Sequence, residues 1–516
     1  MKYLFIDHEH VQRMDRVTQI FHQPIKARGP VVVPDSPWED VRLHIWSAPV
    51  WCEERSRWRM WYYGGENLLP LYAESADGLN WEKPKLGRIS WQGSSNNNIV
   101  NLGFAPQNPK ENRIVLLRDD HDPTRRFKGL TRVSSHLRPL VSPDGLDWTP
   151  LEGQRIPSGD EYRLGFDEHR HRFVATVKLG GSWGGRYPVP EFGRAVSLSV
   201  SEDFERWSDP ALIFWGDEAD QENGKKRIES TVQDADRRAP LVVEPDQFFT
   251  DVYNMPVFTC EDLYLGLPVM FNQSGAYAHS TGANQDGILY PSLVCSRDLY
   301  RWDRLGRQPF IPHSRLSNAQ CWDYGMIQAT RPVVNGEEWW FYYTGTRFTH
   351  LKQELVEQAG MRQSPDEPMG AVFLSRLRMD GFASLHAGRE PGVVLTVPVK
   401  IAGKKLYVNV DAGAGELRVE LRDATTGRGI PGYSLGNFLC DRYVSAEGGG
   451  QKLRVGTGAR FEDDPVENDT VPVRENATRV AAHWQKKVDV SDLLGREVRV
   501  NFYLQDAHLY AFWFGN

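Results

Sequence analysis

Several features that would place this 516-residue chain in a common class are missing from its sequence. No run of 18 apolar residues occurs, so neither a membrane-spanning helix nor a membrane partner is expected. The segment 1–7 has a short apolar run without an extended hydrophobic region or a small-residue cleavage site, so no signal peptide is expected. These features predict a cytoplasmic protein, or a periplasmic or secreted one if a signal sequence has been removed.

Cysteine is scarce, and the sequence fingerprints of cofactors are absent. The five cysteines are odd in number and widely spaced, which fits neither a disulfide framework nor a zinc site and indicates a reducing compartment. There is no Gly-x-Gly-x-x-Gly after a strand, no phosphate-binding Gly-Lys-Ser/Thr loop and no His-Glu-x-x-His. No cofactor and no metal are therefore expected. The cysteines are Cys52, Cys260, Cys295, Cys321 and Cys440.

Charge of one sign is also in short supply, whereas aromatic residues are abundant. The formal net charge is −7 with both signs scattered, and without a basic stripe nucleic acid is excluded as a partner. The chain has 17 tryptophans and 19 tyrosines. Aromatic side chains favour strands, and their faces also stack on sugar rings. Most of them are expected in the cores of sheets.

The pattern Ser-x-Asp-x-x-x-Trp occurs four times and is the strongest signal in the sequence. Two copies contain Asp-Gly, which is typical of a hairpin turn. We expect the serine and aspartate to bind the amides of the turn, and the tryptophan to begin the next strand and become buried. A degenerate fifth copy lies at 375–382, with Phe382 in place of the tryptophan. The four copies begin at Ser75, Ser142, Ser201 and Ser296.

The repeat predicts an all-β fold with two domains. Strand-like segments precede each turn in the same order, which predicts a five-bladed β-propeller over 40–395, with 1–39 leading into it. The polar insertion 217–246 is expected to be a surface or lid loop. Beyond about residue 400 the repeat stops while strand patterns continue, which predicts a C-terminal β-sandwich over 400–516.

Carboxylates precede the first strand of four predicted blades. Because the innermost strands of a propeller surround its axis, residues at their starts should converge in a funnel. Crowded acids raise one another's pKa, and glycoside hydrolysis needs one protonated acid and one ionised partner. The predicted catalytic residues, with no individual role assigned, are Glu39, Asp160, Asp251 and Asp323.

Aromatic and polar residues near these acids are the candidates for sugar binding. His44 is as readily a core histidine as a ligand of the substrate. The acidic segment 118–123 is predicted to be a solvated turn, because it lacks the glycine and terminal glutamate of a calcium loop. The predicted substrate-binding residues are Trp38, His44, Arg163, Tyr253, Asn254, Trp322 and Tyr324.

Segments 72–84, 97–100, 322–326 and 380–385 resemble bacterial proteins described as glycoside hydrolase family 32-like. The resemblance implies the five-bladed propeller and β-sandwich of the invertase and levanase clan, with family 43 arabinanases and xylosidases as relatives. The Trp-Met-Asn-Asp-Pro-Asn, Arg-Asp-Pro and Glu-Cys motifs of family 32 are not matched. The catalytic triad of that family is therefore not transferred to this chain.

The expected function is a glycosidase, exo-acting on a furanoside or a similar sugar. One alternative is a glycoside phosphorylase of the same fold, in which Arg163 and His44 would serve a phosphate site. Another is a non-catalytic carbohydrate-binding propeller, whose carboxylates would be too far apart or paired with arginine. The sequence leaves open the sugar, the linkage, the stereochemical outcome and the oligomeric state.

Overall fold

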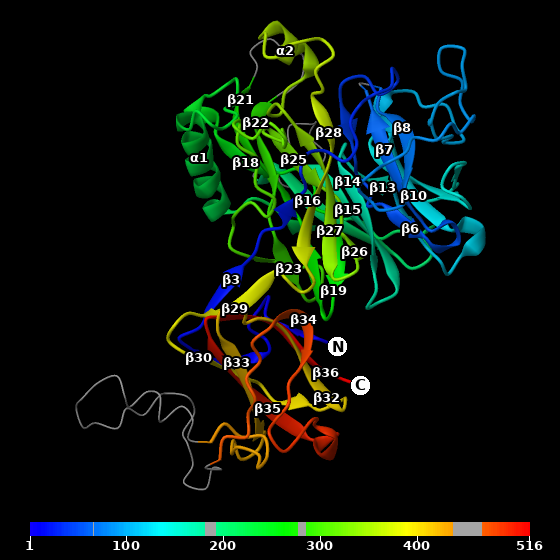
Figure 1. Cartoon of the computed structure of the whole chain (residues 1–516). Helices are drawn as coiled ribbons and strands as arrows, with labels where there is room; N and C mark the ends of the chain where they lie inside the picture. Colours follow the sequence, from blue (N-terminus) through cyan, green and yellow to red (C-terminus); the bar gives the residue numbers. More distant parts are fainter. Residues whose placement is uncertain (66, 181–191, 277–284, 437–466) are drawn as a thin grey trace. The chain divides into compact units, whose positions relative to one another are not determined.

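The computed structural model describes residues 1–65, 67–180, 192–276, 285–436 and 467–516. It is almost entirely β, which confirms the predicted class, and its α-helices in these ranges are α1 (Glu218–Gln233) and α2 (Gln353–Gln358). The chain forms two compact units (Figure 1). The first unit combines Met1–His22 with Leu377–Asn516, and the second unit is Gln23–Arg376. No helix within the described ranges is long and apolar enough to cross a membrane.

The second unit is built from groups of antiparallel strands, here called strand groups 1 to 5. Group 1 comprises β5 (Leu43–His44), β6 (Val50–Cys52), β7 (Arg57–Gly64) and β8 (Leu69–Ser75); group 2 comprises β9 (Ile114–Arg118), β10 (Phe127–Val133), β11 (His136–Ser142), β12 (Thr149–Pro150) and β13 (Ile156–Pro157); group 3 comprises β14 (Tyr162–Asp167), β15 (Arg172–Gly180), β16 (Arg194–Ser201) and β17 (Ala211–Phe214). In groups 2 and 3 the strands β9 to β12 and β14 to β17 pair in chain order, whereas in group 1 the strand β7 pairs with β5, β6 and β8.

Groups 4 and 5 have interrupted strands and are joined to each other. Group 4 comprises β18 (Phe249–Val252), β19 (Val257–Cys260), β20 (Leu263–Gly266), β21 (Val269–Ala276), β22 (Gln285–Pro291), β23 (Val294–Ser296) and β24 (Asp303–Arg304); group 5 comprises β25 (Met326–Ala329), β26 (Val333–Asn335), β27 (Glu338–Thr346), β28 (Gly370–Arg378) and β4 (Ile25–Lys26). Strands β18, β21 and β22 of group 4 form one eight-stranded sheet with group 5 through the parallel pairing of β22 with β25, whereas β19, β20, β23 and β24 form a four-stranded sheet. The last strand of group 5 is β4 from the N-terminal part of the chain, which pairs with β28 and was not foreseen from the sequence.

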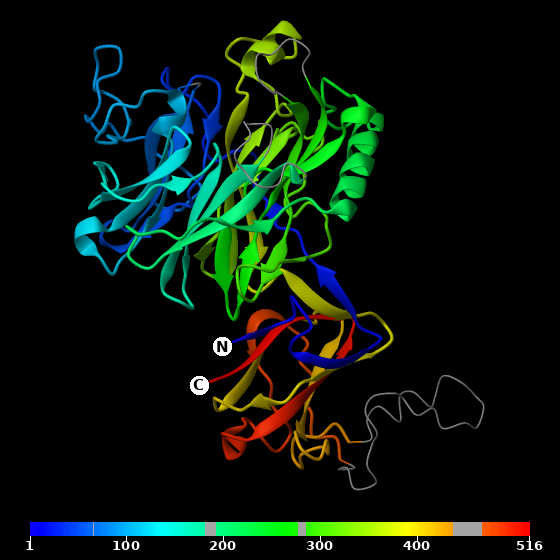
Figure 2. The same cartoon turned by 180° about the vertical axis from the view of Figure 1, so that it is seen from behind.

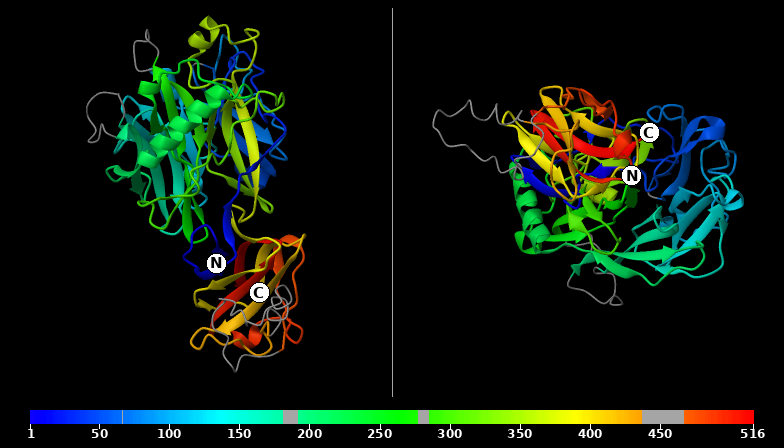
Figure 3. Two further views of the ribbon diagram at one scale, coloured as in Figure 1. Left: turned by 90° about the vertical axis from the view of Figure 1, so that its left-hand side faces the viewer. Right: turned by 90° about the horizontal axis from the view of Figure 1, so that it is seen from below.

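Each strand group contacts the next, and group 5 contacts group 1. Seen from below in Figure 3, the blue, cyan and green strands of the second unit follow one another in sequence order. The contacts between successive groups are Ile114 N to Tyr63 Oη at 2.8 Å, Tyr162 Oη to Arg113 O at 3.0 Å, Thr176 Oγ1 to Met255 O at 2.6 Å, the β-bridge of Leu289 with Met326, and Ile45 N to Thr344 Oγ1 at 2.8 Å.

The repeated turns have the predicted hydrogen bonds. In the first copy, Ser75 Oγ accepts from Gly78 N at 2.8 Å and Asp77 Oδ1 accepts from Leu79 N at 2.8 Å. The indole of Trp81 donates to Gly78 O at 3.1 Å. The residue three places after each serine has a left-handed φ, which explains the glycine in two copies. These residues are Gly78, Gly145, Phe204 and Leu299.

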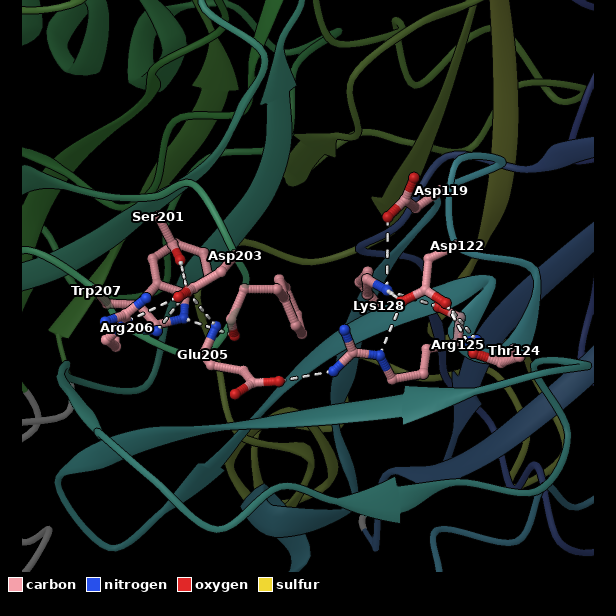
Figure 4. Close-up of polar contacts among 11 residues, drawn as sticks. Asp119, Asp122, Thr124, Arg125, Lys128, Ser201, Asp203, Glu205, Arg206 and Trp207 are labelled. Atoms are coloured by element: carbon pink, nitrogen blue, oxygen red, sulfur yellow. Dashed lines mark hydrogen bonds and ion pairs between the residues drawn. The ribbon is translucent and has the colours of Figure 1, made fainter.

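The third copy of the turn offers a test of its contribution to stability (Figure 4). Asp203 Oδ1 accepts from Glu205 N at 2.9 Å and from Arg206 N at 2.8 Å. We expect Asp203→Ala to lower the free energy of unfolding by about 1 kcal/mol, and the neighbouring exposed Glu202→Ala to change it little. Chemical denaturation measures both.

The pH dependence of this effect has a definite sign. The backbone amide of Arg206 holds the pKa of Asp203 below its ordinary 3.8. The stabilisation is therefore present above pH 3.8 and is lost as the pH falls below it. The difference between wild type and Asp203→Ala should shrink in acid, and an unchanged difference would contradict the role of the charged carboxylate.

Two carboxylates of the acidic segment 118–123 bind a lysine from the following strand. Lys128 of β10 is 2% exposed, and its Nζ lies 2.8 Å from Asp122 Oδ2 and 3.5 Å from Asp119 Oδ2 (Figure 4). Asp122 also accepts from Arg125 N at 3.1 Å and caps the 3₁₀ turn Pro123–Arg125. The segment is therefore a turn held by the neighbouring Lys128.

The insertion 217–246 was predicted to be a loop, but much of it is helix α1. Asp217 and Asp220 form a reciprocal capping box at its start. Ile228 is buried in the core of groups 3 and 4, and α1 lies beside β18 and β21 (Figures 1 and 3). The sequence did not reveal this helix because its exposed face is strongly charged and its apolar residues are few.

The first unit contains two antiparallel sheets that share one core. Figure 2 shows strands from both ends of the chain in this unit. One sheet has β1 (Tyr3–Leu4), β3 (Thr18–Phe21), β29 (Ala383–Ala387), β32 (Lys405–Asp411), β34 (Asn476–Ala481) and β36 (Ala507–Gly515); the other has β2 (Val11–Asp15), β30 (Gly392–Thr396), β31 (Val399–Lys400), β33 (Glu416–Asp423) and β35 (Glu497–Gln505).

The boundary of this unit differs from the one expected near residue 400. Residues 1–22, expected to lead into the propeller, instead add strands to the first unit: β1 pairs with β36, and β3 with β29. The C-terminal part of this unit starts at Leu377, so strand β29 belongs to the first unit and not to the second. Short strands that pair with distant segments leave no periodic signal in the sequence. Cys440 lies outside the described residues, and the other four cysteines are buried.

Candidate functional site

The first strands of groups 2 to 5 bring five buried polar side chains together. They are linked through Glu161, whose Oε1 accepts from Arg113 Nη1 at 3.3 Å. Glu161 Oε2 accepts from Arg163 Nη1 at 3.3 Å and from Asn254 Nδ2 at 3.1 Å. Gln328 Oε1 lies 3.4 Å from Asn254 Nδ2 and 3.5 Å from Arg163 Nη2. We call these residues, Arg113, Glu161, Arg163, Asn254 and Gln328, the central cluster.

The local strand geometry explains why these side chains meet. Tyr162 and Arg163 are neighbours in β14, so they point to opposite faces. Tyr162 donates to Arg113 O in group 2, while Arg163 turns to the cluster. Asn254 follows β18 and Gln328 lies in β25, each the first strand of its group. Residues in or next to the first strands of four groups therefore supply the cluster.

Two stacked rings from group 1, those of Trp46 and His44, lie next to Arg113 of the central cluster. The Arg113 guanidinium lies 4.7 Å from the Trp46 ring. His44 stacks on Trp46 with 5.5 Å between ring centroids and an interplanar angle of 12°. Burial, followed by the charges of Arg42 and Arg113, lowers the pKa of His44 to about 3. The imidazole is therefore neutral at pH 7.

Four buried polar atoms of this region have no hydrogen-bond partner among the described residues. Their residues are at most 5% exposed, apart from the partly buried His44. Unpaired buried polar atoms cost free energy, so such atoms are rare unless a ligand or water serves them. The atoms are His44 Nδ1, Trp46 Nε1, Arg163 Nε and Asn254 Oδ1.

Asp160 and Asp251 lie near a common ammonium group. Lys178 forms an ion pair with Asp160, and its Nζ lies 4.7 Å from the Tyr253 ring centroid. The same ammonium favours the ionised form of Asp251. Tyr253 Oη lies 3.2 Å from His350 Nε2. The structure thus brings Asp160, Asp251 and Tyr253 to one region, as the sequence predicted.

This region adjoins the central cluster. Burial alone would lower the pKa of the Arg113 guanidinium, but Glu161, with Tyr162 and Asp160 after it, outweighs burial and the pKa is raised. Asn254, next in the chain to Tyr253, donates to Glu161, and Arg163 donates to the same carboxylate. These two predicted substrate-binding residues therefore contact the residue that follows Asp160.

Asp251 is held by neighbours that only donate hydrogen bonds. Its Oδ1 accepts from Arg194 N at 2.8 Å, and its Oδ2 contacts the guanidinium of Arg194 and the amide of Gln273. Burial raises the pKa of Asp251, and the charge of Arg194 opposes that shift. Asp251 is 2% exposed, whereas the side chain of Asp160 is 23% exposed.

Glu39 is enclosed in a separate network within group 1. Its Oε2 accepts from Lys83 Nζ and Asp35 N, both at 2.8 Å, and its Oε1 accepts from Tyr62 Oη at 2.6 Å. Burial raises its pKa, which Lys83 opposes. Trp38 donates to Asn98 at 2.8 Å beside it. The contacts of these two predicted residues do not include the central cluster.

Asp323 is fully buried against the N-terminal strand β4. Its Oδ2 accepts from Lys26 Nζ at 2.5 Å and from Tyr343 Oη at 2.9 Å. The neighbouring Trp322 faces the Arg347 guanidinium at 4.3 Å, and Tyr324 donates to Asn318 O at 3.0 Å. None of the contacts described for these three predicted residues reaches the central cluster.

All four predicted catalytic acids are ion-paired with a cationic side chain. An adjacent cation favours the ionised carboxylate. Three of the four partners lie more than 40 residues away in the sequence, which is why the pairing could not be foreseen. The pairs are Glu39 with Lys83, Asp160 with Lys178, Asp251 with Arg194 and Asp323 with Lys26.

Sequence reasoning missed Glu161, Lys178, Arg194 and Gln328, and left the role of Arg113 unclear. A signal for Lys178 was present, since a lysine interrupts the apolar run of β15. Glu161 stands next to the predicted Asp160. In the described residues no group of three or more His, Cys, Asp or Glu side chains has the arrangement of a metal site.

No family model and no curated protein matches the sequence. Among solved structures, the chain is similar to the catalytic domain of a GH62 alpha-L-arabinofuranosidase from Coprinopsis cinerea, with 11% identity, 69% of this chain and 97% of the other covered, and a TM-score of 0.40. The chain is also similar to a fructofuranosidase from Schwanniomyces occidentalis complexed with fructosylnystose. The identity is 8%, 96% of this chain and 98% of the other are covered, and the TM-score is 0.36. A third similar structure is an N-acetylgalactosamine deacetylase from F. plautii in complex with blood group B trisaccharide. The identity is 12%, 71% of this chain and 97% of the other are covered, and the TM-score is 0.39. At these low scores neither fold nor function follows from the likeness.

Proposed function

We propose that strand groups 1 to 5 are the blades of a five-bladed β-propeller and that the two sheets of the first unit form a β-sandwich. The contacts that lead from each group to the next and back to group 1 support the propeller. A core shared by both sheets of the first unit supports the sandwich. On this proposal the central cluster lies at the propeller axis, where the first strands of the blades meet.

We further propose that the protein is a glycoside hydrolase whose sugar binds at the central cluster. The observation that carries this proposal is the convergence of Arg163, Asn254 and Trp46, each with an unpaired buried polar atom, beside Asp160 and Asp251. Sugar hydroxyls both donate and accept hydrogen bonds, so they can serve such atoms. The faces of Trp46 and Tyr253 offer aromatic surface for a sugar ring.

Within this site we propose that Asp160 and Asp251 are the reacting pair. Asp160 is the more exposed of the two and is ion-paired with Lys178, and we assign it the role of base or nucleophile. Asp251 has the raised pKa that a proton donor needs, although Arg194 must move away before it can donate. Glu39 and Asp323, enclosed by lysines, would instead hold neighbouring segments in place.

The furanoside class and attack from the chain end follow from the resemblance of the turn motifs alone. A screen of chromogenic furanosides and pyranosides, with and without added phosphate, tests the reaction. Release of the aglycone without phosphate is the expected result. Release that needs phosphate would identify a phosphorylase, and no release from any glycoside that binds would overturn the hydrolase.

A carbohydrate-binding protein without catalysis is the second candidate, and one observation favours it. Every predicted acid is ion-paired, Asp251 with an arginine, which disfavours sharing a proton. On this alternative the central cluster would bind the sugar as above, but replacing Asp160 or Asp251 would change affinity only.

A further inference from the structure

Two buried arginines of the central cluster share one carboxylate. Glu161 accepts from Arg113 Nη1 and from Arg163 Nη1, both at 3.3 Å. Burial, together with nearby cations, lowers the pKa of His44 to about 3 and the pKa of His350 to about 4, so both imidazoles are neutral at pH 7. Buried charges are costly unless they are paired, so an anionic group beside Arg163 would be favoured.

Two of the four unpaired atoms of the region call for a ligand that accepts hydrogen bonds, whereas Asn254 Oδ1 would accept from a hydroxyl. Arg163 Nε and Trp46 Nε1 can only donate. Arg163 is 3% exposed, and its other nitrogens already reach Glu161, the carbonyl of Tyr162 and Gln328. The free Nε–H of a guanidinium suits the oxygen of a carboxylate, sulfate or phosphate group.

We propose that the central cluster binds an oxyanion, and that the ligand of this protein is an anionic one, with Arg163 and Trp46 donating to the anionic oxygens. This inference rests on the proposed function for the sugar part of the ligand. The oxyanion has two possible sources: the carboxylate of a uronic acid, or inorganic phosphate bound beside a neutral sugar. Both present the same chemistry to Arg163.

Isothermal titration of the full chain with matched ligands tests the inference. Glucuronate is compared with glucose, galacturonate with galactose, and inorganic phosphate is titrated alone and with each neutral sugar. We expect either the uronates to bind at least about tenfold more tightly than their neutral partners, or phosphate to bind with comparable preference. The first result identifies a sugar-borne carboxylate and the second a free phosphate. Neutral sugars that bind as tightly as uronates, with no binding of phosphate, would overturn the proposal.

Two variants and a matched control assign the effect to the cluster. Arg163→Gln should abolish the preference for the anion. Arg418→Gln in the first unit should keep it, although Arg418 is likewise buried and bonded to a glutamate two residues earlier, Glu416. Trp46→Phe, which keeps an aromatic ring but lacks the N–H, should weaken anion binding several-fold even if Arg163→Gln does not fold. Unchanged preference in both cluster variants would refute the assignment.

These results separate the inference from the proposed function. Hydrolysis of neutral glycosides with no anion dependence would leave the hydrolase standing and remove the oxyanion site. Anion binding that requires Arg163, in a protein that hydrolyses no glycoside, would leave the oxyanion site standing and remove the hydrolase.

Discussion

Replacing Asp160 by asparagine should lower kcat on the best glycoside by about 10²–10⁴-fold, because the amide can neither accept a proton nor attack the sugar carbon. Asp251→Asn should have an effect of the same order, since the proton donor would be lost. Thermal unfolding should show that both variants remain folded. Initial rates over a range of substrate concentrations separate kcat from KM.

A matched control and two further variants sharpen this test. Asp209→Asn, at an exposed position of group 3, should leave kcat unchanged. Glu39→Gln and Asp323→Asn should retain most of the activity of the folded protein, because their contacts lie with Lys83 and Lys26. Near-normal kcat in both the Asp160 and Asp251 variants would place the chemistry elsewhere.

The second large effect is on stability. Lys26→Met should lower the free energy of unfolding by about 3–5 kcal/mol, because it leaves the fully buried Asp323 carboxylate with Tyr343 as its remaining partner. It would also loosen β4, the N-terminal strand that completes group 5. Urea denaturation measures the change, and adding Asp323→Asn to this variant should recover part of the loss.

The control for Lys26→Met is the same substitution at a lysine whose ion pair is exposed to solvent. Lys226 lies 2.6 Å from Glu222 on the surface of α1, and Lys226→Met should change stability little. Equal effects of the two lysine substitutions would show that the buried pair contributes no more than a surface pair.

The sequence was most informative where structure is local. The Ser-x-Asp-x-x-x-Trp turns are made within seven residues, so the sequence pattern alone assigns Ser75 and Asp77 to turn amides. The short strands β1, β3 and β4 could not be predicted, because their partners lie hundreds of residues away. Their pairing depends on tertiary structure and leaves no periodic pattern.

The candidate site was predictable only in part, because the local strand pattern indicates where acids lie but not which distant residues contact them. Asp160 and Asp251 were selected because they precede predicted first strands; in the structure Asp251 lies within β18, and both residues lie near the ammonium of Lys178. The same rule selected Glu39 and Asp323, which are enclosed by lysines from other segments. The partner of a buried carboxylate is chosen by the fold, so position along the strand pattern cannot distinguish a reacting acid from a structural one.

A crystal structure of the Asp160→Asn variant soaked with a hydrolysable glycoside is the most direct test of a sugar site at the central cluster. We expect the sugar to lie within hydrogen-bond distance of Arg163 and Asn254, with the glycosidic oxygen between residue 160 and Asp251. A sugar bound at another surface, with the central cluster closed by its own side chains, would contradict the proposal.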